Sequence, residues 1–380
     1  METIKLFYED SHLKAFTAKV LSCAQTEKGY QVALDATAFY PEGGGQACDL
    51  GTLGDARVLD VREKEGVICH LCDKPLEVGA SVHGTIDWAR RFSLMQQHSG
   101  EHIVSGIVHS MFGWHNVGFH MGSQLMTIDF DGPISPEALV EIEQKANEAV
   151  WANLPVRTWY PAPEELPQVP YRSKKALPWP VRIVQIPGID NCACCGTHVK
   201  MTGEIGLIKL VSCIKFHAGV RIEMACGGKA LALTQAVFDQ NRAVSQAFSA
   251  KMLETGAAAA KMNEALTAEK YRTTGLQRRL FDAIAESYRG ISCPLHFEEA
   301  LSGGALRELA EKIEKVCGGA IVCAGTDESG YTVCITGENA RGVGNRAAKA
   351  LNGRGGGNPN AYQGFFRASR AQIECFFEGK

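Results

Sequence analysis

The sequence has no apolar run that approaches the roughly 20 residues needed to cross a bilayer. Its formal net charge is only −3, so the chain as a whole has no strong attraction to nucleic acid or membranes, and any basic surface must be local. Its first residues also lack the basic segment, apolar core and cleavage site of a secretory signal. We therefore expect a cytoplasmic protein with no membrane partner.

Cysteine, by contrast, is abundant. The 380 residues include fourteen cysteines, and 45% of the chain is hydrophobic, an ordinary value for a globular protein. A chain of this length predicts two or three domains. In a reducing compartment the cysteines would be free thiols, some of them metal ligands, and would not form a disulfide framework.

Two pairs of potential metal ligands share a four-residue spacing. His98 and His102 would lie on one face of a helix, one turn apart. Cys194 and His198 repeat the spacing about a hundred residues downstream. Three imidazole nitrogens and one sulfur can complete a tetrahedral zinc site. The sequence therefore predicts one Zn²⁺ ion per chain.

The number of protein ligands bears on what this metal would do. Four ligands complete a tetrahedron, and such closed zinc sites are usually structural, whereas a catalytic zinc keeps an open position. The count favours a metal that positions the substrate while other groups activate water. Cys192 and Cys195 flank Cys194 and are alternative ligands, but only Cys194 has the four-residue offset to His198.

A second interpretation uses the same residues. His98 to His102 matches the H-x-x-E-H pattern of inverted zinc peptidases, in which Glu101 would be the general base. Such peptidases take a carboxylate as third ligand, so the Cys194 and His198 pair does not suit them. The peptidase remains a less favoured alternative.

Hydrophobic periodicity predicts an α+β protein. Short alternating strands over 1–88 predict a small N-terminal β-barrel, and the period changes to that of a helix at Trp88. Helices mixed with antiparallel strands over 89–228 predict an α+β domain that contains the zinc site. Residues 229–289 predict a helical arm, and 290–380 a small C-terminal α/β domain.

The C-terminal domain has a basic, glycine-rich segment. From 341 to 370 there are six basic residues and no acidic one. Within this stretch, 352–359 predicts a loop with exposed amides, which suits phosphate or an RNA backbone, although a solvated turn is the alternative. We also expect a terminal strand near 371–377.

Several stretches resemble the editing module of alanyl-tRNA synthetase and its free-standing relatives, the AlaX alanyl-tRNA editing proteins. They occur in the family's order and are Thr37–Gln46, Gln96–His102, Val117–His120, Cys194–Val199 and Gly219–Glu223. The glycine-rich segment resembles that of the DHH-associated C-terminal domain in the synthetase and in long AlaX forms. The resemblance covers nearly the whole chain.

This resemblance implies a trans-acting, zinc-dependent deacylase. Its substrate would be tRNA(Ala) mischarged with serine, with glycine as a second candidate. By matching position, Thr37 would contact the serine hydroxyl, Gln46 would orient substrate or water, and Glu101 would accept a proton. One departure is that Cys195 stands where the family usually has glycine.

The resemblance also implies contacts with tRNA. The candidate RNA-binding residues are Arg221, Arg354, Gly355, Gly356 and Gly357. The family's paired arginines before Ile-Glu are reduced to Arg221 alone, which weakens that contact. The helical arm and the C-terminal domain would hold the tRNA body or form a homodimer. The alternative in another functional class is a non-catalytic tRNA-binding protein with a structural zinc.

Overall fold

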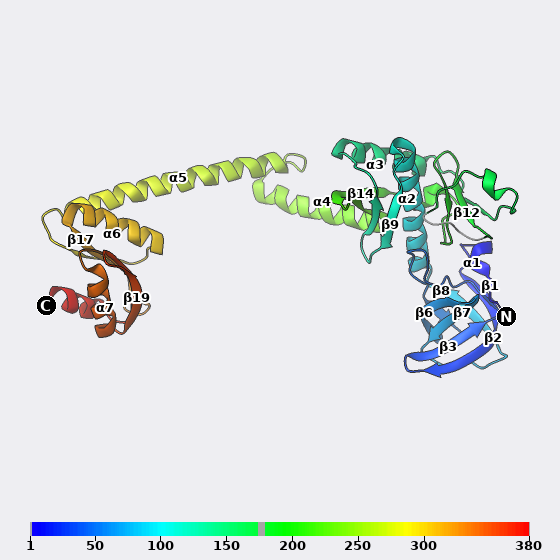
Figure 1. Cartoon of the computed structure of the whole chain (residues 1–380), viewed down its shortest axis with the longest axis horizontal. Coiled ribbons are helices and arrows are strands. Elements are labelled where there is room, and N and C mark those ends of the chain that lie inside the picture. Colours follow the sequence, from blue (N-terminus) through cyan, green and yellow to red (C-terminus); the bar gives the residue numbers. More distant parts are fainter. Residues whose placement is uncertain (1, 174–178, 380) are drawn as a thin grey trace. The chain divides into compact units, whose positions relative to one another are not determined.

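A computed structural model describes residues 2–173 and 179–379 of the chain (Figure 1). The chain divides into two compact units, Met1–Ala243 and Val244–Lys380, which are considered separately below. Mixed helices and sheets confirm the predicted α+β class. The finer division into four domains stays a prediction. Within the described ranges no helix is both long and apolar enough to cross a membrane.

The first unit begins with a closed barrel whose strands follow the order β2-β3-β7-β6-β5-β8. These strands are β2 (Ala15–Thr26), β3 (Gly29–Leu34), β5 (Gly51–Leu53), β6 (Ala56–Lys64), β7 (Val67–Cys72) and β8 (Ser81–Ile86). Alternate residues point inward, so that Phe16, Ala18 and Val20 of β2 are buried. Before the barrel lie β1 (Ile4–Lys5) and the short helix α1 (Leu6–Glu9), and β1 pairs in parallel with β4 (Ala36–Thr37).

Helix α2 (Trp88–Phe112) connects the barrel to the rest of this unit (Figure 1). It begins where the side chain of Asp87 accepts a hydrogen bond from the Arg90 amide, and it ends at Gly113 in a left-handed conformation. Next to the cap, the fully buried Arg91 guanidinium forms an ion pair with the fully buried Asp49 carboxylate from the barrel side. Helix α2 is therefore fixed to the barrel at its first turn.

The remainder of the first unit packs around α2. A four-stranded sheet has the order β14-β15-β10-β9, and a three-stranded sheet the order β11-β12-β13. Helix α3 (Pro136–Trp151), capped by Ser135, packs against α2 and β14. The strands are β9 (Asn116–Met121), β10 (Met126–Phe130), β11 (Arg157–Trp159), β12 (Ile183–Ile186), β13 (Asp190–Ala193), β14 (Ile208–Phe216) and β15 (Gly219–Cys226), with short 3-10 turns η1 (Leu166–Gln168) and η2 (Thr202–Ile205).

Helix α4 (Gly228–Phe248) crosses the boundary between the units, and α5 (Thr255–Ser287) opens the second. A five-stranded sheet of order β16-β17-β18-β20-β19 follows. Its elements are β16 (Leu295–Glu298), α6 (Gly303–Cys317), β17 (Gly319–Thr326), β18 (Gly330–Gly337), α7 (Ala340–Ala350), β19 (Gly353–Asn358), β20 (Ala361–Phe366) and α8 (Arg370–Glu378).

Two predictions for the C-terminus are wrong. The glycine-rich segment is not a loop: it is the edge strand β19, whose residues pair with β20 from Gly353 to Asn358. The last element is the helix α8 where a strand was expected. Ser369 and Gln372 form a capping box at its start, and Ile373 is buried one helical turn before Phe377, which packs against the same core.

Candidate active site

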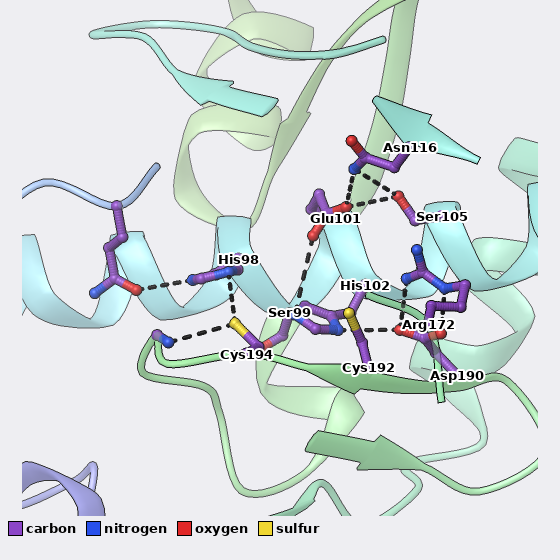
Figure 2. Close-up of polar contacts among 12 residues, drawn as sticks. His98, Ser99, Glu101, His102, Ser105, Asn116, Arg172, Asp190, Cys192 and Cys194 are labelled. Carbon is purple, nitrogen blue, oxygen red and sulfur yellow. Dashed lines mark hydrogen bonds and ion pairs between the residues drawn. The ribbon is translucent and has the colours of Figure 1, made fainter. Parts of the chain in front are cut away.

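The four predicted metal ligands lie together in the structure. Helix α2 presents His98 and His102 one turn apart, and the turn after β13 presents Cys194 and His198. Their potential ligand atoms all lie within 4.8 Å of one another. The Cys194 Sγ atom is 3.3 Å from His98 Nε2 (Figure 2). The three imidazole side chains are almost fully buried.

The backbone turn that carries Cys194 requires a glycine. A Cβ atom on Gly196 would lie 2.1 Å from the Cε1 atom of His98, so no larger residue fits there. The Arg182 guanidinium donates hydrogen bonds to the carbonyl oxygens of Cys194 and Gly196, at 2.9 and 3.0 Å. It also lies 4.7 Å from the centroid of the Tyr8 ring. These contacts connect the turn to Arg182 and, through its guanidinium, to Tyr8 of α1.

The two helix histidines are oriented by hydrogen bonds at Nδ1. His98 Nδ1 lies 2.8 Å from Gln46 Oε1, and His102 Nδ1 lies 3.0 Å from Asp190 Oδ2. Arg172 in turn donates two hydrogen bonds to the Asp190 carboxylate, at 2.7 and 2.8 Å (Figure 2). Because each Nδ1 atom has an oxygen partner, each Nε2 atom remains for a metal, an arrangement typical of zinc-binding histidines.

The protonation chemistry of the other two ligands also suits a metal. Both ring nitrogens of His198 are buried, and among the described residues neither has a hydrogen-bond partner. Burial lowers the pKa of His198 to about 3, which keeps the ring neutral. For Cys194, burial alone would raise the pKa, but His98 and His198 lower it well below the ordinary value. A thiolate with three imidazoles fits Zn²⁺.

A cavity of about 500 Å³ opens onto these residues. Its wall includes Gly44, Glu101, His109, His115, Asn116, Phe119, Tyr171, Arg172, Ser173, Cys192, Ala193 and Cys195 as well as three of the four ligands. Glu101 Oε1 accepts hydrogen bonds from Ser105 Oγ and Asn116 Nδ2, both at 2.6 Å. Glu101 Oε2 lies 3.9 Å from His102 Nε2. The structure thus places the predicted proton acceptor beside the ligand cluster.

Gln46 and Thr37 are the other two predicted catalytic residues, and their surroundings differ from those of Glu101. Gln46 is fully buried: its Oε1 atom also accepts from the Thr197 amide at 3.1 Å, and its Nε2 atom donates to Thr197 Oγ1 at 2.8 Å. Thr37 is fully buried too, with its hydroxyl 2.9 Å from His70 Nε2, and it is not among the residues that line the cavity. Its contact with a substrate hydroxyl, and substrate orientation by Gln46, stay predictions.

Several residues of the site carried no clear sequence signal. His70 points into the barrel between Ile68 and Cys72, and an inward polar residue on an alternating strand needs a partner. That alternation could have identified it. Asp190 and Arg172 could not have been found, because their importance comes only from contact with His102 across the fold.

The two alternative cysteines are placed differently from Cys194. Cys192 lies near His102 and Asp190, in a separate group of potential ligand atoms, whereas Cys195 is in neither group formed by the described residues. Cys195 is exposed, and its carbonyl oxygen accepts a hydrogen bond from Tyr8 at 3.0 Å. The geometry therefore supports Cys194 as the sulfur of the four-residue cluster.

The predicted RNA-binding residues lie far from one another in the sequence. Arg221 on β15 forms two hydrogen bonds with the Asp129 carboxylate, at 2.6 and 2.8 Å, and its guanidinium lies 3.7 Å from the Phe216 ring centroid. Arg354 and Gly355–Gly357 are exposed on β19, in the second unit. Their contacts with RNA stay predictions.

Known families match both the barrel and the turn that carries Cys194 and His198. Residues 181–223 match the family described as the threonyl and alanyl tRNA synthetase second additional domain, and residues 3–90 match class II (A) tRNA synthetases. The chain is 28% identical to the alanyl-tRNA editing protein Aarsd1 of Mus musculus, over 94% of this chain and 93% of that protein. It is 27% identical to Aarsd1 of Danio rerio, over 97% and 96%.

A longer relative shares the same region. The chain is 32% identical to the alanine–tRNA ligase of Thermofilum pendens over 94% of its own length, but it spans only 42% of that ligase. The similarity to the editing proteins extends over nearly the whole of both chains. The chain therefore belongs to the family of alanyl-tRNA editing proteins, which is related to one part of the alanine–tRNA ligases.

Proposed function

We propose that this protein is a trans-acting deacylase that hydrolyses the aminoacyl ester of mischarged Ser-tRNA(Ala), with Gly-tRNA(Ala) as a second substrate. The observation that carries the proposal is the cluster of His98, His102, Cys194 and His198, three of which line a cavity large enough for an aminoacyl end. The names of the editing relatives support the same reaction.

Zn²⁺ is the metal that this donor set fits best, and the four cluster residues would hold it. When bound, it would supply a positive charge that attracts oxygen atoms of the substrate's aminoacyl end. Water attacks the ester carbonyl carbon, and the products are the free amino acid and the tRNA with a free terminal hydroxyl. The Oε2 atom of Glu101 would accept a proton from that water, because Oε1 is already engaged by Ser105 and Asn116.

A second site that recognises serine has a clear physical purpose. An apolar synthetic pocket rejects an added hydroxyl by only about 100-fold, whereas a site that hydrogen-bonds the hydroxyl rejects a ligand without it far more strongly. Thr37 is the proposed contact. In the structure its hydroxyl forms a hydrogen bond with His70, so Thr37 must give up or share that hydrogen bond to contact the serine hydroxyl.

The second unit would contribute to the binding of the tRNA body. Strand β19 is an exposed sheet edge that carries Arg354, and its small glycines leave backbone groups accessible. We assign phosphate contacts to this edge and to Arg221. We also propose that the helical arm or the C-terminal unit forms the contact of a homodimer.

Deacylation assays test the proposal directly. The protein loaded with Zn²⁺ should release serine from labelled Ser-tRNA(Ala) much faster than alanine from Ala-tRNA(Ala). Equal loss of both esters, or of neither, contradicts it. Tight tRNA binding without turnover would instead establish a non-catalytic tRNA-binding protein with a structural metal.

Substitution of the ligands links the activity to the cluster. The double variant His98→Ala with Cys194→Ala should lose both the metal and the activity. His83→Ala is the matched control, because His83 is an exposed histidine on the barrel strand β8. Full activity of the double variant without metal would remove zinc from the proposed function.

A further inference from the structure

Asn116 has an unused hydrogen-bond acceptor at the candidate active site. It is the first residue of β9, is only 5% exposed and forms part of the cavity wall. Its Oδ1 atom is buried and has no hydrogen-bond partner within the described residues. Buried acceptors are almost always paired in folded proteins, so an unpaired one on a cavity wall indicates a donor that arrives with a ligand.

The orientation of the Asn116 amide is fixed by its neighbours. Its Nδ2 atom donates to Glu101 Oε1 at 2.6 Å and to Ser105 Oγ at 3.2 Å. An ionised carboxylate only accepts hydrogen bonds, so the amide nitrogen must face Glu101. Figure 2 shows the Asn116 oxygen turned away from both Glu101 and Ser105. A rotation of the amide would therefore lose two bonds and place two acceptors against each other.

The charge beside this acceptor indicates what kind of donor it would meet. Glu101 supplies a carboxylate next to Asn116. Arg172 is the one arginine or lysine among the described residues of the cavity wall, and Asp190 already engages it through two hydrogen bonds. A neutral acceptor beside a carboxylate favours a positively charged donor over a neutral hydroxyl, since hydrogen bonds that involve an ion are stronger.

We infer that Asn116 Oδ1 binds the α-ammonium group of the aminoacyl ester and makes Asn116 a substrate-binding residue. This inference rests on the proposed function and deepens it, because it names the feature shared by all aminoacyl substrates of the cavity. Side-chain recognition at Thr37 would select serine, whereas Asn116 would select an amino acid over an acyl group that lacks nitrogen.

A substrate without the ammonium group tests the inference. The 3-hydroxypropionyl ester of tRNA(Ala) equals the seryl ester with hydrogen in place of the ammonium group. For the zinc-loaded wild-type protein, kcat/KM should be at least about tenfold higher for the seryl ester than for the 3-hydroxypropionyl ester. This preference corresponds to about 1.4 kcal/mol of transition-state stabilisation. Asn116→Ala should reduce that preference about tenfold. An unchanged preference in the variant overturns the inference.

Ser105→Ala is the matched control, because it removes a donor to Glu101 and leaves the Asn116 acceptor in place. Ser105→Ala should lower the rates for both esters by the same factor and leave the preference for the seryl ester unchanged. If Asn116→Ala has the same effect as Ser105→Ala, Asn116 serves only to hold Glu101, and the inference is wrong.

A binding measurement on the wild type covers the case in which Asn116→Ala does not fold. Adenosine carrying a 3′-amide-linked serine cannot be hydrolysed, and calorimetry should show that it binds at least about tenfold more tightly than its deaminated analogue. Equal affinities overturn the inference. Preferential binding combined with no hydrolysis of any ester would instead contradict the proposed function and leave the ammonium site established.

Discussion

The Nδ1 atom of His98 and the Oε1 atom of Gln46 lie 2.8 Å apart, although 52 positions separate the two residues in the chain. Gln46 closes the glycine turn between β4 and the barrel strand β5, where Gly43 and Gln46 pair with each other. The same oxygen accepts from the Thr197 amide in the ligand turn. One buried carboxamide thus connects the barrel, α2 and the turn that carries Cys194.

Gln46→Ala should weaken zinc binding. Loss of a hydrogen bond that orients a metal-binding histidine typically lowers metal affinity roughly 10- to 100-fold. Competition with a chromophoric chelator measures the affinity. Gln31→Ala on the exposed side of β3 is the control and should bind zinc like the wild type. An unchanged affinity in Gln46→Ala would show that the bond does not orient His98.

Gly196→Ala tests the close approach of the ligand turn to α2. The added methyl group would lie 2.1 Å from Cε1 and 2.3 Å from Nδ1 of His98, so the turn or the ring must move. We expect a loss of zinc affinity of roughly tenfold or more. Gly228→Ala, which meets no atom within 4 Å, is the control. Zinc titration of both variants measures the affinities. Equal affinities would contradict the close approach of Gly196 to His98.

The histidine pair of the cluster was predictable because its spacing is local. A four-residue interval on a helix places His98 and His102 on one face whatever surrounds them. The contacts that orient these rings are not local: Asp190 reaches His102 across 88 positions and was not predicted. No pattern within a short window encodes such a pair, since it depends on how β13 packs against α2.

The fold shows the same division between local and distant information. The cap at Ser135 and the end of α2 at Gly113 follow from the residues at those positions, because serine accepts a hydrogen bond from the first turn and glycine adopts a left-handed conformation. The segment 353–358 was expected to be a loop because glycine disfavours strands. It is a strand because β20 supplies hydrogen-bond partners along its length, a property of its neighbour.

The buried histidine of the barrel should make stability depend on pH. Burial lowers the pKa of His70 from 6.5 to about 4. The unfolded chain therefore binds a proton below pH 6.5 that the folded protein does not take up until about pH 4. The free energy of unfolding should decrease as pH falls through this window, by up to about 3 kcal/mol from this residue.

His70→Gln separates this contribution from those of other groups. Glutamine cannot be protonated there, so chemical denaturation at several pH values should show a flatter profile between pH 6.5 and 4 than in the wild type. The variant is also expected to be less stable at pH 7, where only packing and the bond to Thr37 are affected. His83→Gln, at an exposed position, should keep the wild-type slope. Parallel profiles for all three proteins would show that His70 is not held neutral.

Arg354→Ala should weaken tRNA binding through the loss of a phosphate contact. The side chain is exposed on the edge strand β19, and no acidic residue lies between 341 and 370 to neutralise it within that stretch. A single phosphate contact changes the slope of log affinity against log salt by about 1 and does not depend on base sequence.

Arg307→Ala is the matched control: Arg307 is an exposed arginine of the same unit, but Glu311 accepts its hydrogen bond at 2.7 Å. Filter binding of tRNA from low to moderate salt should give a shallower slope for Arg354→Ala alone. Equal slopes for the two variants would mean that the edge strand binds no phosphate, and the acid-free stretch would then have another role.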